Sequence, residues 1–335
     1  MIRRIVFLLC LAALAVPAFS QTTLNGAGAT FPYPIYSKWF SEYNKLHSDV
    51  QINYQSIGSG GGIRQVLNGT VDFGASDGPM SDEQLAQAKI KILHIPTVLG
   101  AVVPAYNVPG VSGEIKFTPE ILASMFLGKI TNWNDAAIAK VNPGVKLPNQ
   151  DVIIVHRSDG SGTTFIFTDY LSKVSNEWAT GPKKGTTVSW PLGLGGKGNE
   201  GVAGQIRQLP GAIGYIELIY ALQNNIPYGS VKNSAGNFVK ASLSGVTEAA
   251  GSVKNMPADF RVSITNAPGK DAYPISSFTW LLIPVQSKDA NKGKIINDFL
   301  NWMVSDGQKM TAQLSYAPLP ESVAEKVKAT VKQVH

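Results

Sequence analysis

Apolar residues follow two periodicities along the chain, and the two alternate. Short β-branched and apolar runs predict strands at 50–54, 73–75, 91–95, 98–106, 152–155 and 273–284. Between them, apolar residues recur every three or four positions, which predicts helices. One helical face carries Ile35, Trp39, Phe40, Tyr43 and Leu46, and another carries Phe167, Tyr170, Leu171 and Val174. Further helices are predicted at 295–303 and 323–331. This alternation predicts an α/β fold with mainly parallel sheets.

The first twenty residues have the pattern of a cleavable secretory signal peptide. Arg3 and Arg4 precede an apolar run, and small Ala18 and Ser20 end it. The apolar run is short for a membrane span and is followed by polar residues, so we expect cleavage rather than anchoring. The mature protein is therefore expected to be exported, and no later segment has the pattern of a membrane span.

The only cysteine, Cys10, lies inside this expected signal. Bulky Leu9 precedes it where a lipoprotein signal would have a small residue, so lipid attachment is not expected. The mature chain would then have neither a disulfide nor thiol chemistry. Removing 20 of the 335 residues leaves 315, about twice the size of a typical single-core domain, so two domains are expected.

The net charge is mildly basic and suits an anionic ligand. It is +6 for the whole chain, and it becomes +4 when Arg3 and Arg4 leave with the signal. Lysines and arginines are spread along the sequence without a dense basic block or interleaved aromatic residues. A nucleic-acid partner is therefore not expected.

Four stretches place small or hydroxyl residues directly before a helical pattern. They are G-A-G-A-T-F-P-Y-P from Gly26, I-G-S-G-G-G from Ile57, G-A-S-D-G-P-M-S-D-E-Q from Gly74 and R-S-D-G-S-G-T-T from Arg157. Helix N-termini present unpaired N–H groups and the positive end of the helix dipole, so they bind anions. One such turn alone is more often a plain helix cap, as Ser81 with Gln84 in capping-box spacing would be. Four of them together predict an anion site.

Arg157 stands at the start of the fourth stretch and strengthens this prediction. A guanidinium fork can bind two oxygens of a tetrahedral oxyanion at once. A surface salt bridge is the alternative role for this arginine. The pattern therefore favours a phosphate-type site, with sulfate or another tetrahedral oxyanion as the closest rival ligand.

Two carboxylates, Asp77 and Asp159, stand in these stretches although an anion site should not favour negative charge. If Asp77 faces the ligand it can only accept a hydrogen bond, which requires a proton on the anion. Monohydrogen phosphate carries that proton and sulfate does not, and such mismatches at polar sites cost about 10⁴ to 10⁵ in selectivity. A helix cap or turn is the alternative role for Asp77. Asp159 is expected to orient Arg157.

The chain resembles the periplasmic phosphate-binding proteins of bacterial ABC phosphate transporters over essentially its whole mature length. Besides the motifs quoted, the resemblance rests on Y-Q-S-I-G-S-G-G-G from Tyr54, V-D-F-G-A-S-D from Val71, W-P-L-G-L-G-G-K-G-N from Trp190 and P-G-A-I-G-Y from Pro210. It implies a dehydrated anion between two lobes. The ligand residues that it implies are Thr30, Phe31, Ser59, Asp77, Arg157, Asp159, Ser161, Gly162 and Thr163.

The resemblance also implies a class II periplasmic binding protein, with two doubly wound lobes joined by a two-strand hinge near Val98 and Tyr273. Lobe I would comprise 21–97 and 273–335, and lobe II would comprise 98–272. The protein would be a monomer that closes on phosphate, docks on a membrane permease and catalyses no reaction. Phe31 is expected to bind the anion mainly through its backbone N–H rather than through its side chain.

Two positions depart from the family pattern. Gly60 stands where a second serine is common, and His156 stands where a basic residue often precedes the binding arginine. Neither change removes a ligand group, although the loss of a positive neighbour at 156 could weaken the local field.

An enzyme is the weaker interpretation. Ser59 and Ser161 lack the G-x-S-x-G frame of a hydrolase nucleophile, because Ile57 and Asp159 occupy the first glycine position. The stretch G-L-G-G-K-G from Gly193 resembles a nucleotide-binding loop but departs from it in several positions, and we interpret it as a glycine-rich interlobe loop. A secreted phosphatase-like enzyme that uses the same oxyanion site remains the alternative.

Metal and cofactor sites are not expected. The histidines, which are His47, His94, His156 and His335, show no metal-ligand spacing and no cysteine assists them. The six tryptophans are expected to be packing groups rather than sugar platforms.

Overall fold

The computed structural model describes residues 21–335, so the expected signal peptide lies outside the described residues. Its main feature is an eight-stranded sheet in the order β2-β1-β3-β11-β4-β8-β6-β7. These strands are β1 (Thr22–Gly28), β2 (Val50–Ser56), β3 (Phe73–Ser76), β4 (Ile92–Asn107), β6 (Ile153–Arg157), β7 (Leu194–Gly196), β8 (Ala212–Glu217) and β11 (Ser276–Pro284). A smaller sheet has the order β10-β9-β5, from Phe238–Val239, Ser230–Lys232 and Lys116–Phe117.

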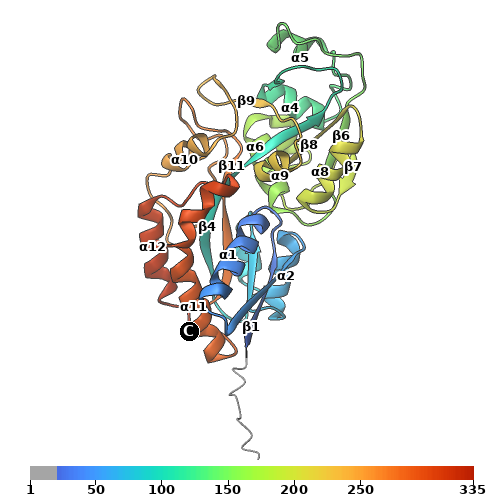
Figure 1. The fold of residues 1–335 in the computed structure, drawn as a ribbon. Coiled ribbons are helices and arrows are strands. Elements are labelled where there is room, and N and C mark those ends of the chain that lie inside the picture. The colour runs from blue at the N-terminus through green and yellow to red at the C-terminus, as the bar shows by residue number, and fades with distance from the viewer. Residues whose placement is uncertain (1–20) are drawn as a thin grey trace, which may run out of the picture.

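Helices cover these sheets, and Figure 1 shows them in two groups. The lower group contains α1 (Tyr33–Leu46), α2 (Ser59–Asn68), α11 (Ala290–Met303) and α12 (Glu321–Val331). The upper group contains α4 (Pro119–Phe126), α5 (Ala136–Val141), α6 (Gly162–Val174), α8 (Gly198–Gln208) and α9 (Leu218–Gln223). The other helices are α3 (Asp82–Leu85), α7 (Asn176–Thr180), α10 (Leu243–Gly251) and a 3₁₀ helix at Gly307–Leu314.

Strand β4 is sixteen residues long and runs through both groups of elements (Figure 1). It pairs with β11 from Ile92 to Ala101 and with β8 from Val102 to Asn107. The prediction of separate strands at 91–95 and 98–106 was wrong, because a single strand spans both runs and includes Pro96. The pairing register shifts opposite this point, between Thr279 and Trp280, so the strand continues through the proline.

The sheet is mixed rather than mainly parallel. β1 is parallel to β2 and β3, and β6 is parallel to β7 and β8. The two central strands, β4 and β11, are antiparallel to all their neighbours. The α/β class is therefore confirmed, and the mainly parallel sheet is not.

These strand directions determine where the functional loops lie. β1, β2 and β3 run in the same direction as β4, whereas β6, β7 and β8 run against it. Because β4 passes from the first set to the second, the carboxyl ends of both sets point toward the same middle region. In open α/β sheets, ligands bind outside the carboxyl ends of the strands.

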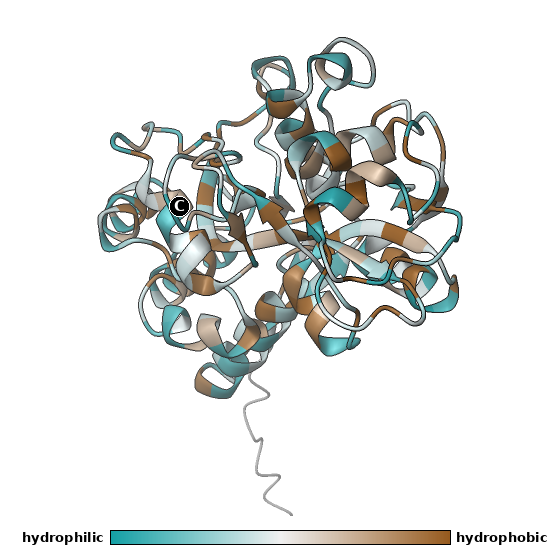
Figure 2. Cartoon of the chain, turned by 90° about the horizontal axis from the view of Figure 1, so that it is seen from above, coloured by the Kyte–Doolittle hydropathy of each residue, from teal (hydrophilic) through white to brown (hydrophobic). Residues whose placement is uncertain are grey.

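The predicted helical faces pack into the core, with one exception. On α1, Trp39 and its apolar neighbours are buried, but Leu46 is 63% exposed because it is the last residue of the helix. On α6, Phe167, Tyr170 and Leu171 are buried. Figure 2 shows hydrophobic colouring through the central strands and hydrophilic colouring along many outer loops. Among residues 21–335, no helix is both long and apolar enough to cross a membrane.

Candidate functional site

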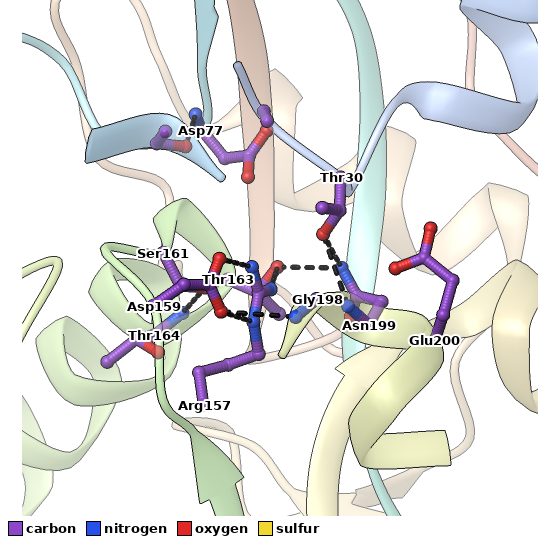
Figure 3. A network of polar contacts seen from close by, with 12 residues as sticks. Thr30, Asp77, Arg157, Asp159, Ser161, Thr163, Thr164, Gly198, Asn199 and Glu200 are labelled. Atoms are coloured by element: carbon purple, nitrogen blue, oxygen red, sulfur yellow. Dashed lines mark hydrogen bonds and ion pairs between the residues drawn. The ribbon is translucent and has the colours of Figure 1, made fainter. Parts of the chain in front are cut away.

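The predicted ligand residues converge where the two sets of strands point toward each other. Thr30 and Phe31 follow β1, Ser59 begins α2 and Asp77 follows β3. Arg157 ends β6, and α6 begins at Gly162, five residues later. In Figure 3, Thr30 and Asp77 lie across from the residues of the β6–α6 loop. Buried positions among the predicted residues are Thr30, Phe31, Ser59, Asp77, Arg157, Ser161, Gly162 and Thr163.

The N-terminus of α2 lies against the loop that leads into α6. The Gly60 N–H donates to the Gly160 carbonyl at 2.9 Å. A Cβ atom built on Gly162 would lie 2.5 Å from both Asp77 Oδ2 and Ser59 Oγ. Residues from three separate predicted motifs therefore meet at the start of α6, where there is no room for a side chain at position 162.

The Arg157 guanidinium is held in one orientation. Its Nε donates to Asp159 Oδ1 at 2.8 Å and its Nη2 donates to Asp159 Oδ2 at 2.5 Å. Its Nη1 donates to Thr163 Oγ1 at 3.3 Å. Within the described residues, these bonds engage three of the five N–H groups of the arginine, which leaves two for a ligand.

Asp159 is placed to orient Arg157, as its sequence position indicated. Its Oδ1 also accepts the Gly198 N–H at 3.1 Å. Burial alone would raise the pKa of Asp159, but the hydrogen bonds and positive charge of Arg157 outweigh it, so the pKa lies below its usual value. The carboxylate therefore stays ionised and keeps the arginine fixed.

Asp77 is the second carboxylate of the site and is 1% exposed. Its Oδ1 accepts the Thr279 hydroxyl at 2.8 Å, and its backbone N–H donates to Ser59 Oγ at 3.2 Å. Burial raises its pKa to about 7, against the opposing effects of the Thr279 hydrogen bond and the Arg157 charge. The Ser59 hydroxyl also lowers the pKa of this carboxyl. Oδ2 faces the start of α6, where it lies 2.5 Å from the Cβ position built on Gly162, so it is the carboxyl oxygen that a ligand there would meet.

The side chain of Phe31 is fully buried and belongs to the core. Its carbonyl accepts the Tyr316 hydroxyl at 2.6 Å. Its ring packs so closely on Gly100 of β4 that a Cβ atom there would lie 2.6 Å from the ring. A ligand at this point would therefore meet the Phe31 N–H rather than the ring.

Asn199 lies among the predicted ligand residues, and the sequence reasoning missed it. Its Nδ2 lies 2.8 Å from Thr30 Oγ1 and 3.1 Å from Thr163 Oγ1, so it bridges two predicted ligand residues (Figure 3). It is the second residue of α8, at the end of the G-L-G-G-K-G-N motif. That motif counted toward the family resemblance and was interpreted as a loop, but Asn199 itself was not singled out, although an asparagine directly at a helix start was a signal that could have identified it.

The two departures from the family pattern have different surroundings. A Cβ atom on Gly60 would lie 3.1 Å from the Gly160 Cα, so the close backbone contact leaves little room for a serine there. His156 stacks on Trp190, with ring centroids 4.9 Å apart, and its Nδ1 lies 3.0 Å from the Arg157 backbone carbonyl. A charge at position 156 would therefore not face the site directly.

Glu217 ends β8 beside the site and is fully buried. Its Oε2 accepts the Ile219 N–H at 2.8 Å, but its Oε1 has no partner among the described residues. Oε1 lies 3.1 Å from the Cβ position built on Gly100. Burial raises the pKa of this carboxyl well above its usual value, because a buried carboxylate loses its hydration.

We expect Glu217→Gln to stabilise the protein, and increasingly so as the pH rises. A carboxyl whose pKa is raised on folding stabilises fully below its unfolded pKa of about 4.3, and this contribution is lost as the pH rises toward the folded pKa. The neutral amide does not undergo this loss. Thermal melts should therefore show a gain of ~2–5 °C at pH 8 and little gain at pH 4.5.

Gln223→Glu on the neighbouring helix α9 is the control, because position 223 is exposed. Its melting temperature should follow that of the unchanged protein at both pH values. If Glu217→Gln is less stable at pH 8 than at pH 4.5, relative to the unchanged protein, the pKa of Glu217 is not raised on folding.

No group of three or more His, Cys, Asp or Glu side chains within residues 21–335 is placed to hold a metal ion. The site instead combines N–H and O–H donors with one available carboxylate oxygen. This composition is suited to an oxyanion that carries a proton.

Comparison with known proteins identifies the family. The model of the PBP superfamily domain matches residues 15–307. The phosphate-binding protein PstS of Xylella fastidiosa (strain Temecula1 / ATCC 700964) is 46% identical over 318 residues, which cover 93% of this chain and 86% of the relative. The resemblance drawn from the motifs is therefore confirmed.

Solved structures share the fold at lower identity. A phosphate-binding protein from Stenotrophomonas maltophilia has a TM-score of 0.71 at 18% identity, covering 92% of this chain and 93% of that chain. A high-affinity periplasmic phosphate-binding protein bound with phosphate has a TM-score of 0.74 at 21% identity, with the same coverage. By its sequence and its fold, the chain belongs to the PBP superfamily and to the PstS phosphate-binding proteins.

Proposed function

We propose that this protein binds inorganic phosphate and delivers it to the permease of an ABC phosphate transporter, without catalysing a reaction. The observation that carries the proposal is the buried meeting of Arg157, two helix N-termini and the acceptor Asp77. The relatives at this level of identity are phosphate-binding proteins by name. An ABC phosphate transporter is the partner that the family implies.

The proposed phosphate contacts combine charge, hydroxyl groups and backbone N–H groups. Arg157 supplies two free N–H groups, and the starts of α2 and α6 supply backbone donors. Asp159 acts by holding the arginine through two hydrogen bonds. The proposed set is Thr30, Phe31, Ser59, Asp77, Arg157, Asp159, Ser161, Gly162 and Thr163.

Asp77 is the proposed basis for choosing phosphate over sulfate. With Oδ1 occupied by Thr279, Oδ2 can accept the proton of monohydrogen phosphate. Sulfate carries no proton at neutral pH, so its oxygen lone pairs would face those of the carboxylate in a buried setting. That unfavourable pairing costs far more than a missing contact in water.

The proposed architecture has lobe I at 21–97 and 273–335 and lobe II at 98–272. Two segments would form the hinge: β4, and the stretch before β11. In support, the Val102 N–H donates to the Ile275 carbonyl at 2.9 Å, so the two segments run side by side at the junction. Opening would then bend two hydrogen-bonded segments rather than a flexible linker.

Contacts between the proposed lobes support a closed arrangement. The Arg261 Nη1 lies 2.7 Å from Asp82 Oδ1 and 3.0 Å from the Met80 carbonyl. The Tyr220 hydroxyl donates to the Thr30 carbonyl at 2.6 Å. These bonds would break if the lobes opened. Bound phosphate would further favour the closed arrangement, because it would join donors from both lobes.

The proposed location is the periplasm, reached through the expected signal peptide, where the protein would act as a monomer. The periplasmic description belongs to a structural relative. The pattern of residues 1–20 supports the same location for this chain.

Calorimetric titration of phosphate-stripped protein tests the proposal. We expect one-to-one binding of phosphate, no heat from sulfate at the same concentration, and no phosphate release from a nitrophenyl phosphate ester in the presence of added metal ions. Equal binding of sulfate, or silence with phosphate, would contradict the proposed ligand. Ester hydrolysis would support the enzyme alternative instead.

A further inference from the structure

We propose that Asn199 is a positioning residue that turns the hydroxyl protons of Thr30 and Thr163 toward the bound anion. Both threonines then act only as donors, and the site disfavours a protonated oxygen at either position. This role rests on the proposed phosphate function and adds a specificity-determining residue to the same site.

The orientation of the Asn199 amide is fixed by β8. Its Oδ1 accepts the Glu217 backbone N–H at 2.9 Å, and the side chain is fully buried. The flipped amide would place an NH₂ group against this N–H, which would leave two donors facing each other. The Nδ2 group, with its two protons, therefore points toward the threonines.

Thr30 receives two hydrogen bonds on the same oxygen. Asn199 Nδ2 donates to Oγ1 at 2.8 Å, and the Asn199 backbone N–H donates to it at 3.3 Å. A hydroxyl oxygen has two lone pairs. Because both are occupied, the hydroxyl can offer a ligand only its proton.

The hydroxyl oxygen of Thr163 also has both lone pairs occupied, although one of its two donors is different. Its Oγ1 accepts Asn199 Nδ2 at 3.1 Å and Arg157 Nη1 at 3.3 Å. Its proton is again the only group left for a ligand. One buried amide therefore sets the polarity of two hydroxyls that reach the site from opposite sides (Figure 3).

A ligand with a second proton would find no acceptor at either threonine. Asp77 Oδ2 accepts one proton, which suits monohydrogen phosphate. Without the Asn199 amide, each threonine oxygen still accepts one hydrogen bond, from the backbone N–H of residue 199 or from Arg157. Its second lone pair becomes free, so either oxygen could accept a hydrogen bond from a P–OH group. Loss of Asn199 should therefore harm binding of the dianion more than binding of the monoanion.

Asn199→Leu tests this role, with phosphate titrations at about pH 5.5 and about pH 8.5, on either side of the second ionisation of phosphate. Relative to the unchanged protein at the same pH, which carries the same titration of Asp77 with its pKa of about 7, we expect affinity to fall ~30-fold at the higher pH and only ~3-fold at the lower pH, because each lost bond in a buried site costs roughly a factor of ten. A purely structural role would lower affinity equally at both pH values.

Asn199→Asp is a second variant that keeps the side-chain volume and the acceptor for the Glu217 N–H. Its carboxylate accepts the threonine protons and turns them away from the ligand, so phosphate affinity at pH 8.5 should fall ~100-fold. Gln208→Glu is the control, because it adds the same charge at the exposed last residue of α8. Its affinity should stay within about twofold of the unchanged protein, and thermal melts verify the folding of all three variants.

The proposal is overturned if Asn199→Leu loses the same factor at both pH values, or if Asn199→Asp binds phosphate within about threefold of the Gln208→Glu control. These outcomes are read against an unchanged protein that binds phosphate. Failure of that protein to bind would be a separate result, because it removes the proposed function itself.

Discussion

Arg157→Met should weaken phosphate binding about a thousandfold, the largest single loss that we expect in this site. Methionine keeps much of the side-chain length but removes the charge and every N–H group. Two N–H groups would be lost to the ligand, and Asp159 would lose the partner of its two arginine bonds. Removing one member of a buried charge pair commonly costs 2–5 kcal/mol or more. Calorimetric titration at neutral pH measures the change.

The matched control is Arg207→Met, an exposed arginine near the end of α8 whose Nη1 contacts Asn224. It changes the net charge by the same amount and should leave phosphate affinity within about twofold. An Arg157→Met variant that is folded by thermal melting and binds within tenfold of the unchanged protein would place the arginine outside the anion site.

Asp77→Asn should relax the discrimination against sulfate by about a thousandfold, while phosphate affinity falls only ~10-fold. The Thr279 hydroxyl donates to Oδ1, so the amide that replaces the carboxylate keeps its oxygen there. Its NH₂ group then occupies the place of Oδ2 and can donate to an unprotonated oxygen. Competition titrations of sulfate against phosphate measure the ratio of the two affinities.

Asp72→Asn is a suitable control, because Asp72 is paired with Lys292 at the opposite end of the β3 region and lies away from the site. Its selectivity should match that of the unchanged protein. If Asp77→Asn also keeps its selectivity, the available Oδ2 does not face the ligand, and the choice of phosphate must come from other groups.

The sequence was informative about the loops of the site because each is a short contiguous motif. The capping box at Ser81 and Gln84 forms as expected, and α6 begins directly after Ser161. Such helix starts depend on residues that are close in the chain. Local chemistry therefore predicted where donors would be exposed, although not which helix starts would meet.

The meeting of these loops depends on the path of the sheet, which local patterns describe poorly. Separate strands were predicted at 91–95 and 98–106, whereas β4 continues through Pro96 and connects the two sets of elements. The antiparallel placement of β11 was also missed, since a buried apolar run shows no strand direction. The continuity of β4 and the direction of β11 both depend on pairing between segments that are distant in the sequence.

Asn199 was missed for the same physical reason. Its partners are Thr30, Thr163 and Glu217, at separations of 169, 36 and 18 residues. The motif around it showed a glycine-rich turn and a helix start, but the function of a buried amide lies in its partners. Only the folded arrangement brings the three together.

The place of β11 in the sheet constrains the order in which the chain can complete its fold. It lies between β3 and β4, although its residues 276–284 are synthesised long after both. Until they are available, β3 and β4 each keep an unpaired edge, and unpaired edges expose a chain to association with other chains. The sheet centre therefore closes late, and a chain stopped before residue 276 would be prone to aggregate rather than form a smaller stable protein.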